Sequence, residues 1–337
     1  MIKARINDIA KHLDIDMIGF THSGPLERIR PQLQNRVDKE RATEFEERNL
    51  DLRLDPRLTM ENCKSIIVVA LSYNREKKDT KKARVKGSLS KSSWGRDYHY
   101  VLKGKMDFLV NEMKKEFAFN HMSFCDTGPL VDRELAHRAG IGYYGKNCSI
   151  INPEYGSFIF IGYILTDLEI ECEDKNMESL CGDCSLCSLA CPTGALEGAG
   201  ILNPKKCVSY LTQTKEPIPE DLSSGMGIKV YGCDTCQLVC PKNKYVKISH
   251  HGEFDPLKTG GIVDIEELIN MSKKEFHVKY GDMAGSWRGK TVLLRNSIIA
   301  LENMGTHCHK DLIETLERKN IKLLKPYTSR ILKGMVE

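Results

Sequence analysis

The chain has 337 residues, of which 41% are hydrophobic and 28% are charged, and its formal net charge is +4. This composition is typical of a soluble globular protein with two or three domains. The charge is too small to demand a polyanionic partner, and the absence of any run of eighteen apolar residues argues against a membrane span.

The N-terminal residues MIKARINDIAKHLDIDMIGF lack the continuous apolar stretch of a signal peptide. Thirteen cysteines in a chain without a secretion signal predict a reducing compartment, and we expect the cytoplasm. There, clustered cysteines bind metal or perform redox chemistry more often than they form disulfides. A chain of this length can bury its own core, so it does not need a disulfide scaffold.

The first half of the chain predicts alternating helices and strands. Residues 3–13 have the apolar spacing of an amphipathic helix, and residues 100–119 have a second helical pattern. The segment SIIVVALSY (65–73) is short, apolar and β-branched, as in a buried strand, and SFIFIGYILTDLEI (157–170) contains another. Residues 1–170 therefore predict an α/β or α+β domain.

The second half predicts two different regions. Residues 171–250 are rich in cysteine, glycine and proline, as expected where a metal centre replaces a large apolar core. Residues 251–337 return to helical patterns at 264–276, 290–304 and 310–325, which predict a pair or triplet of helices packed as a cap.

Two basic stretches lie in the two halves of the chain. The first, which reads as a loop, comprises Arg75, Lys77, Lys78, Lys81, Lys82, Arg84, Lys86 and Lys91. The second comprises Arg318, Lys319, Lys322, Lys325, Arg330 and Lys333. Charge alone favours a solvated surface over phosphate contacts at both places.

The segment CGDCSLCSLACPTGAL (181–196) contains four cysteines within eleven residues. Cys181, Cys184 and Cys187 repeat as C-x2-C-x2-C, the spacing with which three thiolates bind three irons of one cluster. Cys191 follows after three residues and precedes a proline. In two-cluster ferredoxins, a cysteine at this position binds the other cluster.

A second motif, YGCDTCQLVCPKN, supplies that other cluster. Cys233 and Cys236 keep the C-x2-C spacing, whereas the next position in the repeat is Val239. Cys240 precedes a proline and completes the first cluster, and Cys207, between the two motifs, completes the second. The sequence thus predicts two 4Fe–4S clusters. Their ligands are Cys181, Cys184, Cys187 and Cys240 for the first, and Cys191, Cys207, Cys233 and Cys236 for the second.

Zinc is the competing interpretation, because two C-x2-C pairs can form a four-thiolate site, but it does not explain two cysteine–proline crossing ligands. The remaining cysteines, at 63, 125, 148, 172 and 308, lack such spacing and predict ordinary thiols. A two-cluster electron carrier needs only a fraction of this length. The large N-terminal region is therefore expected either to use the electrons or, in an electron-transfer protein, to dock partners.

The segment CDTGPLVDRELAHRAGIGYYGKN (125–147) is dense in residues typical of a site. It contains Asp126, Asp132, His137, Arg138 and Lys146. Its three glycines, at 140, 142 and 145, allow the backbone to approach a flat ligand closely. The alternative is a glycine-rich turn with ordinary surface charges. No phosphate-binding loop motif occurs elsewhere in the chain.

Five segments resemble, in the same order and at similar separations, motifs of the epoxyqueuosine reductase family. They are WGRDYHYVLKGKM, DTGPLVDRELAHRAGIGYYGKN, CGDCSLCSLACPTGAL, YGCDTCQLVCPKN and SWRGKTVLLRNSIIALENMG, over roughly residues 50–305. The resemblance implies reduction of epoxyqueuosine in tRNA to queuosine, the last step of queuosine synthesis. It also implies a cobalamin cofactor, two 4Fe–4S clusters and a catalytic domain related to cobalamin-dependent reductive dehalogenases.

The resemblance also implies roles for individual residues. Asp126 is similar to the proposed proton donor above the cobalamin, and Asp132 matches the same motif. The implied cobalamin cradle comprises Arg138, Gly140, Gly142, Gly145, Lys146 and Asn147. Tyr98 and His99 fall in the active-site region. Leu102 stands where a cobalt-binding D-x-H-x-x-G motif has glycine, so we do not expect His99 to bind cobalt.

The resemblance further implies tRNA and an unidentified low-potential electron donor as partners of a monomer. Many family members continue into helical repeats that help to hold tRNA, whereas this chain has one short HEAT-like set of helices. Tyr143, Tyr144 and Cys148 also depart from the commonest family residues. A dehalogenase-like reductase of a small molecule remains the alternative enzyme.

Overall fold

A four-stranded sheet organises the N-terminal half of the computed structural model, which describes residues 2–76, 83–305 and 309–335. Its strands lie in the order β1 (Met17–His22), β2 (Ser65–Ser72), β7 (Ile159–Thr166) and β4 (His121–Phe124), and all pair antiparallel. Helices alternate with strands as predicted. The antiparallel pairing corrects the α/β alternative, because a sheet of this kind belongs to a mixed α+β architecture.

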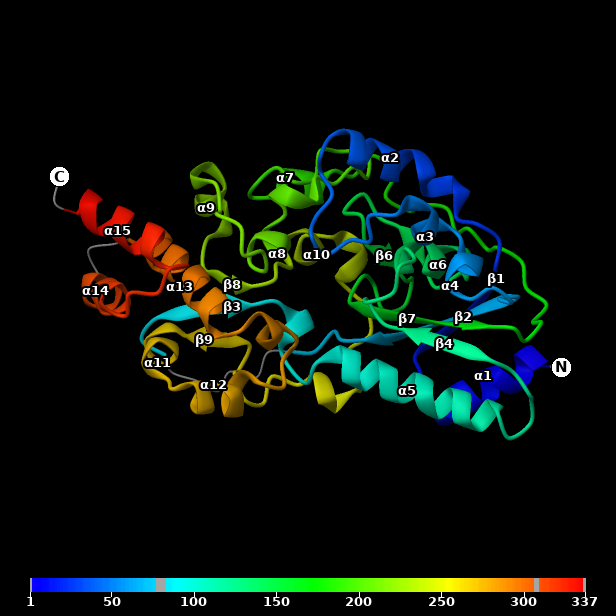
Figure 1. Cartoon of the computed structure of the whole chain (residues 1–337). Coiled ribbons are helices and arrows are strands. Elements are labelled where there is room, and N and C mark those ends of the chain that lie inside the picture. Colours follow the sequence, from blue (N-terminus) through cyan, green and yellow to red (C-terminus); the bar gives the residue numbers. More distant parts are fainter. Residues whose placement is uncertain (1, 77–82, 306–308, 336–337) are drawn as a thin grey trace.

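Both faces of this sheet are covered by helices (Figure 1). The residues of β2 are all buried, and they alternate between the faces. Its odd-numbered residues 67–71 share a core with α1 (Ile2–His12) and α5 (Tyr98–Met113). The even-numbered residues 66–70 share a core with α6 (Asp132–Arg138) and α2 (Arg30–Asp38). The helices predicted at residues 3–13 and 100–119 are therefore confirmed.

Smaller elements surround this sheet. They are α3 (Leu50–Leu54), α4 (Pro56–Thr59), the two-stranded pair β5 (Tyr143–Tyr144) and β6 (Ile150–Ile151), and the 3-10 helices at Glu27–Ile29 and Lys91–Ser93. The β5–β6 pair closes the glycine-rich segment that follows α6. None of the helices in the described part of the chain has the length and apolar character needed to cross a bilayer.

A second sheet joins distant parts of the sequence. β3 (Lys86–Leu89) lies between β8 (Lys229–Tyr231), to which it is parallel, and β9 (Ile262–Asp264), to which it is antiparallel. The first basic stretch therefore contains a strand where a loop was expected. Val85, Leu89 and Trp94 enter the apolar core of the C-terminal helices. This apolar core therefore contains residues from all three predicted regions, on both sides of the boundaries expected near residues 170 and 250.

The cysteine-rich block is built from short elements, and the C-terminal region is helical (Figure 1). The block contains α7 (Leu186–Leu189), α8 (Val208–Leu211), α9 (Glu220–Met226), α10 (Thr235–Leu238) and the 3-10 helices Pro204–Lys206 and Pro241–Asn243. Two further 3-10 helices, Gly252–Phe254 and Ala284–Arg288, follow it. The C-terminal helices are α11 (Ile265–Asn270), α12 (Lys273–Tyr280), α13 (Lys290–Met304), α14 (Lys310–Arg318) and α15 (Lys325–Gly334).

The described part of the C-terminal region thus has five helices instead of the expected pair or triplet. One reason lies in the segment 264–276, which was predicted as a single helical pattern. Ser272 and Glu275 form a capping box that starts α12 and separates it from α11. The 3-10 helix Gly252–Phe254 leads the chain back to the N-terminal core through Phe254.

A buried cation holds the cluster block against α13. The Arg295 guanidinium donates to the carbonyl oxygens of Thr214 and Leu211, at 2.6 and 2.7 Å. The neighbouring Asn296 amide donates to the carbonyls of Thr212 and Val230, both at 2.8 Å. Burial lowers the pKa of Arg295 to about 10. These bonds fix the chain that follows Cys207 and the strand that precedes Cys233.

We predict that Arg295→Leu destabilises the protein by on the order of 3 kcal/mol, because two buried carbonyl oxygens lose their donors. Thermal unfolding and iron content would be measured together, with Arg318→Leu on the exposed end of α14 as the control. Iron loss is expected from the Arg295 variant only. Equal melting temperatures for the two variants would contradict this role.

Candidate active site and cluster sites

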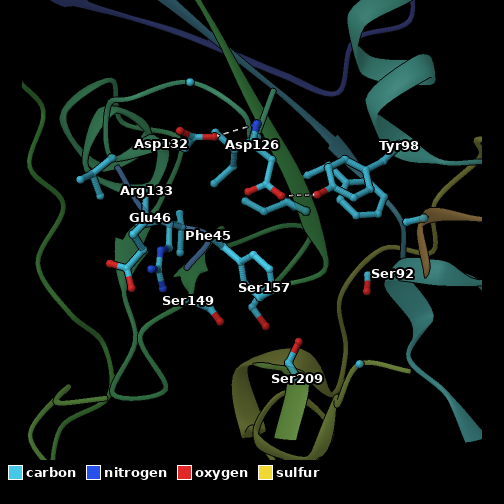
Figure 2. Close-up of a pocket in the computed structure, with 18 of the residues that line it drawn as sticks. Phe45, Glu46, Ser92, Tyr98, Asp126, Asp132, Arg133, Ser149, Ser157 and Ser209 are labelled. Atoms are coloured by element: carbon cyan, nitrogen blue, oxygen red, sulfur yellow. Dashed lines mark hydrogen bonds between the residues drawn. The ribbon is translucent and has the colours of Figure 1, made fainter. Parts of the chain in front are cut away.

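A cavity of about 530 Å³ lies between the four-stranded sheet and the cysteine-rich block. The sheet side contributes Tyr98 at the start of α5, Asp126 after β4, and Phe160 on β7. The block contributes Ser209, Gly232 and Gln237, among others. Figure 2 shows Asp126 and Tyr98 on one side of this space and Ser209 on the other. The cavity therefore has walls from two regions that are distant in sequence.

Tyr98 and Asp126 meet inside this cavity. The Tyr98 hydroxyl donates to Oδ2 of Asp126 at 2.6 Å (Figure 2). The Tyr98 ring stacks on Phe160, with centroids 4.1 Å apart and planes at 7°. Burial raises the pKa of Tyr98 well above its ordinary value, and the Asp126 charge raises it further. Tyr98 therefore remains a hydrogen-bond donor at neutral pH.

Asp126 occupies the left-handed backbone region, with φ of 60°. Its side chain is 67% exposed, so it projects into the cavity. Its backbone N–H donates to Oδ2 of Asp132 at 3.2 Å, which holds the turn. Burial, followed by the Asp126 charge, raises the pKa of Asp132 to about 7. The two carboxylates thus have different surroundings, one open to the cavity and one desolvated.

His99 lies behind this pair. Its Nδ1 is 2.7 Å from Oδ1 of Asp97, and its Nε2 is 3.8 Å from Oδ2 of Asp126. Burial lowers the pKa of His99, but the hydrogen bond to Asp97 and the charges of Asp97 and Asp126 together outweigh burial, so the pKa is raised overall. The ring also stacks on Tyr98 at 4.1 Å. His99 is therefore fixed by carboxylates on both sides.

The predicted cradle residues divide into two groups. Gly145 and Lys146 line a second cavity of about 700 Å³, which shares Arg53, Val131 and Arg133 with the first. The side chain of Asn147 is buried, and its Nδ2 has no hydrogen-bond partner among the described residues. Asn147 directly follows Lys146 in the chain but lines neither cavity itself.

The other members of the predicted cradle, Arg138, Gly140 and Gly142, line neither cavity. Arg138 donates to the carbonyls of Gly24 and His22, at 2.8 and 3.0 Å, and pairs with Asp174 at 3.2 Å. Gly142 lies so close to Ile151 that a Cβ would be 2.5 Å from its carbonyl oxygen. These three residues therefore support the loop from behind.

The second cavity has a basic lining, although Arg28 pairs with Glu134, and Arg36 and Arg53 pair with Glu46. Its cationic lining residues are Arg28, Arg36, Lys39, Arg41, Arg53, Arg133 and Lys146. Glu197 is the acidic residue among the described lining residues, and it pairs with Arg41 at 2.9 Å. Sequence reasoning missed this patch because its residues are dispersed over more than a hundred positions. A concave surface of this charge suits an anionic ligand.

An aromatic group at the edge of the first cavity was also missed. Phe45 and Trp287 are 42% and 58% exposed, and their ring centroids are 5.8 Å apart. The Arg288 guanidinium lies 5.2 Å from the Phe45 centroid and 4.5 Å from that of Trp287. Phe45 itself lines the cavity (Figure 2). Exposed aromatic rings beside arginine are typical of surfaces that bind unpaired nucleobases.

The cysteines predicted to bind the clusters gather in two groups. Burial raises the pKa of the Cys240 thiol, and three neighbouring cysteines of its predicted set raise it further: Cys181, Cys187 and Cys184. Burial likewise raises the pKa of Cys207, followed by Cys233 and Cys191. Cys236 interacts with the same group. Helices α7 and α10, which carry ligands of both sets, contact each other.

The spacing of these sulfurs argues against zinc. Four thiolates around zinc, with Zn–S distances of about 2.3 Å, would lie about 3.8 Å apart. In the described part of the chain, no group of three cysteine sulfurs lies within 4.8 Å. The described cysteines are also all free of disulfides, whereas Cys308 lies outside the described residues. The described cysteines therefore form no compact four-thiolate zinc site.

The two basic stretches offer fewer free cations for binding phosphate than their charge suggested. Arg75 pairs with Asp255 at 2.6 Å, and the Lys91 ammonium donates to Asn74 at 2.8 Å. In the second stretch, Arg330 pairs with Glu220 and Glu302. Lys77, Lys78, Lys81 and Lys82 lie outside the described residues. The groups that pair internally are not free to bind phosphate.

The fold, the carboxylate-lined cavity and the two cysteine groups define the chain as an iron–sulfur oxidoreductase. The family profile described as "Epoxyqueuosine reductase QueG, DUF1730" matches residues 53–127, and the "4Fe-4S double cluster binding domain" matches residues 180–243. An epoxyqueuosine reductase of Lactococcus garvieae is 41% identical over 305 residues, which cover 90% of this chain and 87% of the relative.

Solved structures agree with this result. An epoxyqueuosine reductase from Streptococcus thermophilus has a TM-score of 0.91 at 36% identity, covering 98% of this chain and 89% of the other. An epoxyqueuosine reductase with an epoxyqueuosine-modified tRNA-Tyr stem loop has a TM-score of 0.89 at 33% identity, covering 98% of both chains. The chain belongs to the epoxyqueuosine reductase family.

We predict a pH dependence of stability that Asp132 causes. Its pKa in the folded protein, about 7, lies above the ordinary 3.8. Between these values the folded chain holds a proton that the unfolded chain releases, so stability should rise as the pH falls from about 7 to about 4. Melting temperatures between pH 5 and pH 8 should show this slope in the parent and a weaker one in Asp132→Asn. Asp107→Asn, on the exposed face of α5, serves as the control and should keep the parent slope. An unchanged slope in Asp132→Asn would contradict the prediction.

Proposed function

We propose that this protein reduces epoxyqueuosine in tRNA to queuosine, with electrons from two 4Fe–4S clusters and with cobalamin bound between the sheet and the cluster block. The single observation that carries the proposal is the cavity in which the Tyr98–Asp126 pair faces the chain beside the cluster cysteines. Membership of the epoxyqueuosine reductase family supports the reaction. The electron-carrier and dehalogenase alternatives are set aside on that ground.

The residues around the two cavities fit cobalamin. Its corrin requires a broad opening with close backbone approach, and residues 128–133, which begin with Gly128 and Pro129, line the first cavity. The buried, unpaired Nδ2 of Asn147 and the basic second cavity suit its polar periphery. When bound, cobalamin supplies a strongly reducing cobalt centre. Gly145, Lys146 and Asn147 would hold it, and Arg138, Gly140 and Gly142 would support their loop.

Asp126 is the proton donor in this proposal. Opening an epoxide to an alkene requires two electrons and protons that neutralise the leaving oxygen. The Asp126 carboxyl projects into the cavity, and the Tyr98 hydroxyl, 2.6 Å away, holds its orientation. His99, whose Nε2 lies 3.8 Å from Oδ2 of Asp126, is the neighbour that would return a proton to this carboxyl. Asp132 fixes the turn through the Asp126 amide.

The cluster nearer the substrate would be the one bound by Cys191, Cys207, Cys233 and Cys236. Gly232 and Gln237, which line the cavity, are the immediate neighbours of Cys233 and Cys236. Ser209 lies two residues after Cys207 and lines the cavity as well. The cluster bound by Cys181, Cys184, Cys187 and Cys240 would receive electrons first, from a low-potential donor of unidentified nature.

Recognition of tRNA would use the aromatic group at the cavity edge. To reach the cavity, the modified base must leave its stack in the anticodon loop, and its neighbours then need a stacking surface. Phe45 and Trp287 offer two exposed ring faces, and Arg288 adds positive charge. The basic second cavity is continuous with this edge through Arg53 and Arg133.

The proposed organisation has three parts: a cobalamin-binding catalytic domain (1–170), a ferredoxin-like domain with both clusters (171–250) and a C-terminal helical region (251–337) that acts as a short HEAT-like cap. The β3 strand and the Arg295 network tie the second part to the third. We propose that the protein is a monomer. We also propose that it is cytoplasmic, because two sets of cysteines without disulfides are typical of reducing surroundings.

Anaerobically reconstituted protein should contain about eight irons per chain, as two cubanes. Cys207→Ala should lose one cluster, because its thiol belongs to the group of Cys191, Cys233 and Cys236. Iron analysis and electron paramagnetic resonance of the reduced protein would measure both results. The matched control is Cys63→Ala, a buried thiol apart from the two groups. Four irons in the parent, or eight in Cys207→Ala, would disprove the assignment.

Trp287→Ala should weaken tRNA binding roughly tenfold, since one stacked base contributes about 1–3 kcal/mol. Trp287→Phe keeps a ring face and should lose less. Tyr245→Ala, an exposed aromatic residue that lines neither cavity, is the control. Binding of the anticodon stem loop would be measured by fluorescence anisotropy at two salt concentrations. Equal affinities for Trp287→Ala and Tyr245→Ala would exclude the stacking role.

Asp126→Asn tests the proposed function directly. Asparagine tolerates the left-handed backbone and still accepts the Tyr98 hydrogen bond, but it cannot donate an acidic proton. Conversion of epoxyqueuosine tRNA should fall roughly 10²-fold or more in a single turnover with pre-reduced cobalt, while clusters, cobalamin and tRNA remain bound.

Asp132→Asn should cost less activity than Asp126→Asn, because it acts on the turn and not on the substrate. If Asp126→Asn retains the parent rate under these conditions, another group supplies the proton. If the parent protein itself converts no epoxyqueuosine tRNA, the proposed function fails.

A further inference from the structure

Two histidines and two aspartates meet on the sheet side of the molecule, apart from the residues that line the two cavities. Asp14 and Asp16 immediately precede β1, and His250 and His251 lie on the chain that returns from the cluster block. Nε2 of His250 is 2.8 Å from Oδ2 of Asp14. Nε2 of His251 is 2.9 Å from Oδ2 of Asp16, whose Oδ1 is 3.6 Å from Nδ1 of His250.

The four side chains pack around the buried carboxylate of Asp16. The Asp16 side chain is 1% exposed. Its Oδ2 accepts a hydrogen bond from the Ser72 amide at 2.7 Å and contacts Nε2 of His251. The two imidazole rings lie 4.1 Å apart. Two carboxylates and two imidazole rings, all groups that bind metal ions, are thus held together.

One divalent cation would bind the Asp14 carboxylate together with nitrogens of both imidazole rings. Ligand atoms of Asp14, His250 and His251 all lie within 4.8 Å of one another, and no other group in the described part of the chain meets this condition. The 2.8 Å between Nε2 of His250 and Oδ2 of Asp14 is a hydrogen-bond distance, and it would open to about 3.3 Å between two ligands of one tetrahedral zinc ion. Asp16 contacts both rings and can orient them, as carboxylates beside metal-bound histidines do.

We propose that Asp14, His250 and His251 form a binding site for a divalent transition-metal cation, with zinc as the best match to their nitrogen and oxygen ligands. The ion can enter from solvent, because the side chains of Asp14 and His250 are 63% and 51% exposed. The turn that presents Asp14 is fixed, since the Lys105 ammonium donates to the carbonyls of Leu13 and Asp14 at 2.7 and 3.2 Å.

The ion would join the α1–β1 turn to the chain that follows the second cysteine motif. Ser249 already attaches that chain to the end of β2, through its amide and the carbonyl of Asn74 at 2.9 Å and through its hydroxyl and the carbonyl of Ser72 at 2.5 Å. A metal at residues 14 and 250 would add a second attachment nearby. Its role is therefore structural, and it is independent of the reaction in the cavity.

Zinc titration of the protein with both clusters loaded tests the site. After treatment with a chelator, anaerobic titration with Zn²⁺ against a chromophoric zinc indicator should reveal one saturable ion per parent chain. His250→Ala and Asp14→Asn should lose this ion, and Asp16→Asn should bind it about 10–100-fold more weakly. His277→Ala, an exposed histidine on α12, is the matched control and should bind zinc like the parent.

A second readout separates the metal site from a plain network of hydrogen bonds. Zinc should raise the melting temperature of the parent and of His277→Ala, but not that of His250→Ala or Asp14→Asn. Asp14 is exposed, so its variant does not threaten the fold. The proposal would be overturned if the parent and His250→Ala took up equal amounts of zinc. It would also be overturned if zinc left the melting temperature of the parent unchanged. Neither result depends on the enzymatic activity.

Discussion

The side chain of Gln237 makes the contact on which the cavity depends. Its amide donates to the Ser157 carbonyl at 2.9 Å and to the Tyr73 hydroxyl at 3.2 Å. Asn243 adds hydrogen bonds to the Ser157 amide and hydroxyl, at 2.8 and 2.9 Å. A cysteine-rich block has little apolar surface with which to dock, so such buried polar bonds hold its orientation. They set one wall of the cavity against the other.

The two walls of the cavity are built in different ways. In the sheet wall, the Tyr98 ring stacked on Phe160 holds its hydroxyl against Asp126. The block wall is formed by short turns between cluster cysteines, which the Arg295 and Asn296 side chains anchor from behind. A reaction that needs both a proton and electrons can thus receive the proton from one wall and the electrons from the other.

Local patterns predicted much of this molecule. The strand at 65–73 and the helices at 3–13 and 100–119 follow from periodicity, and the cysteine groups follow from spacing that cluster geometry imposes. Antiparallel pairing and the strand at Lys86–Leu89 were not predictable, because they depend on partners that are distant in the sequence. The Phe45–Trp287 group and the basic cavity escaped notice for the same reason. The family motifs indicated Asp126, but its hydrogen bond with Tyr98 required the fold.

The central claim is that cobalamin binds beside the cluster of Cys191, Cys207, Cys233 and Cys236. Electron paramagnetic resonance of the anaerobic protein, with cobalt in its paramagnetic Co(II) state, tests this claim most directly. Reduction of the clusters should broaden or split the cobalt signal, because two spins separated only by the cavity wall interact. A cobalt signal that is identical before and after cluster reduction would contradict this account.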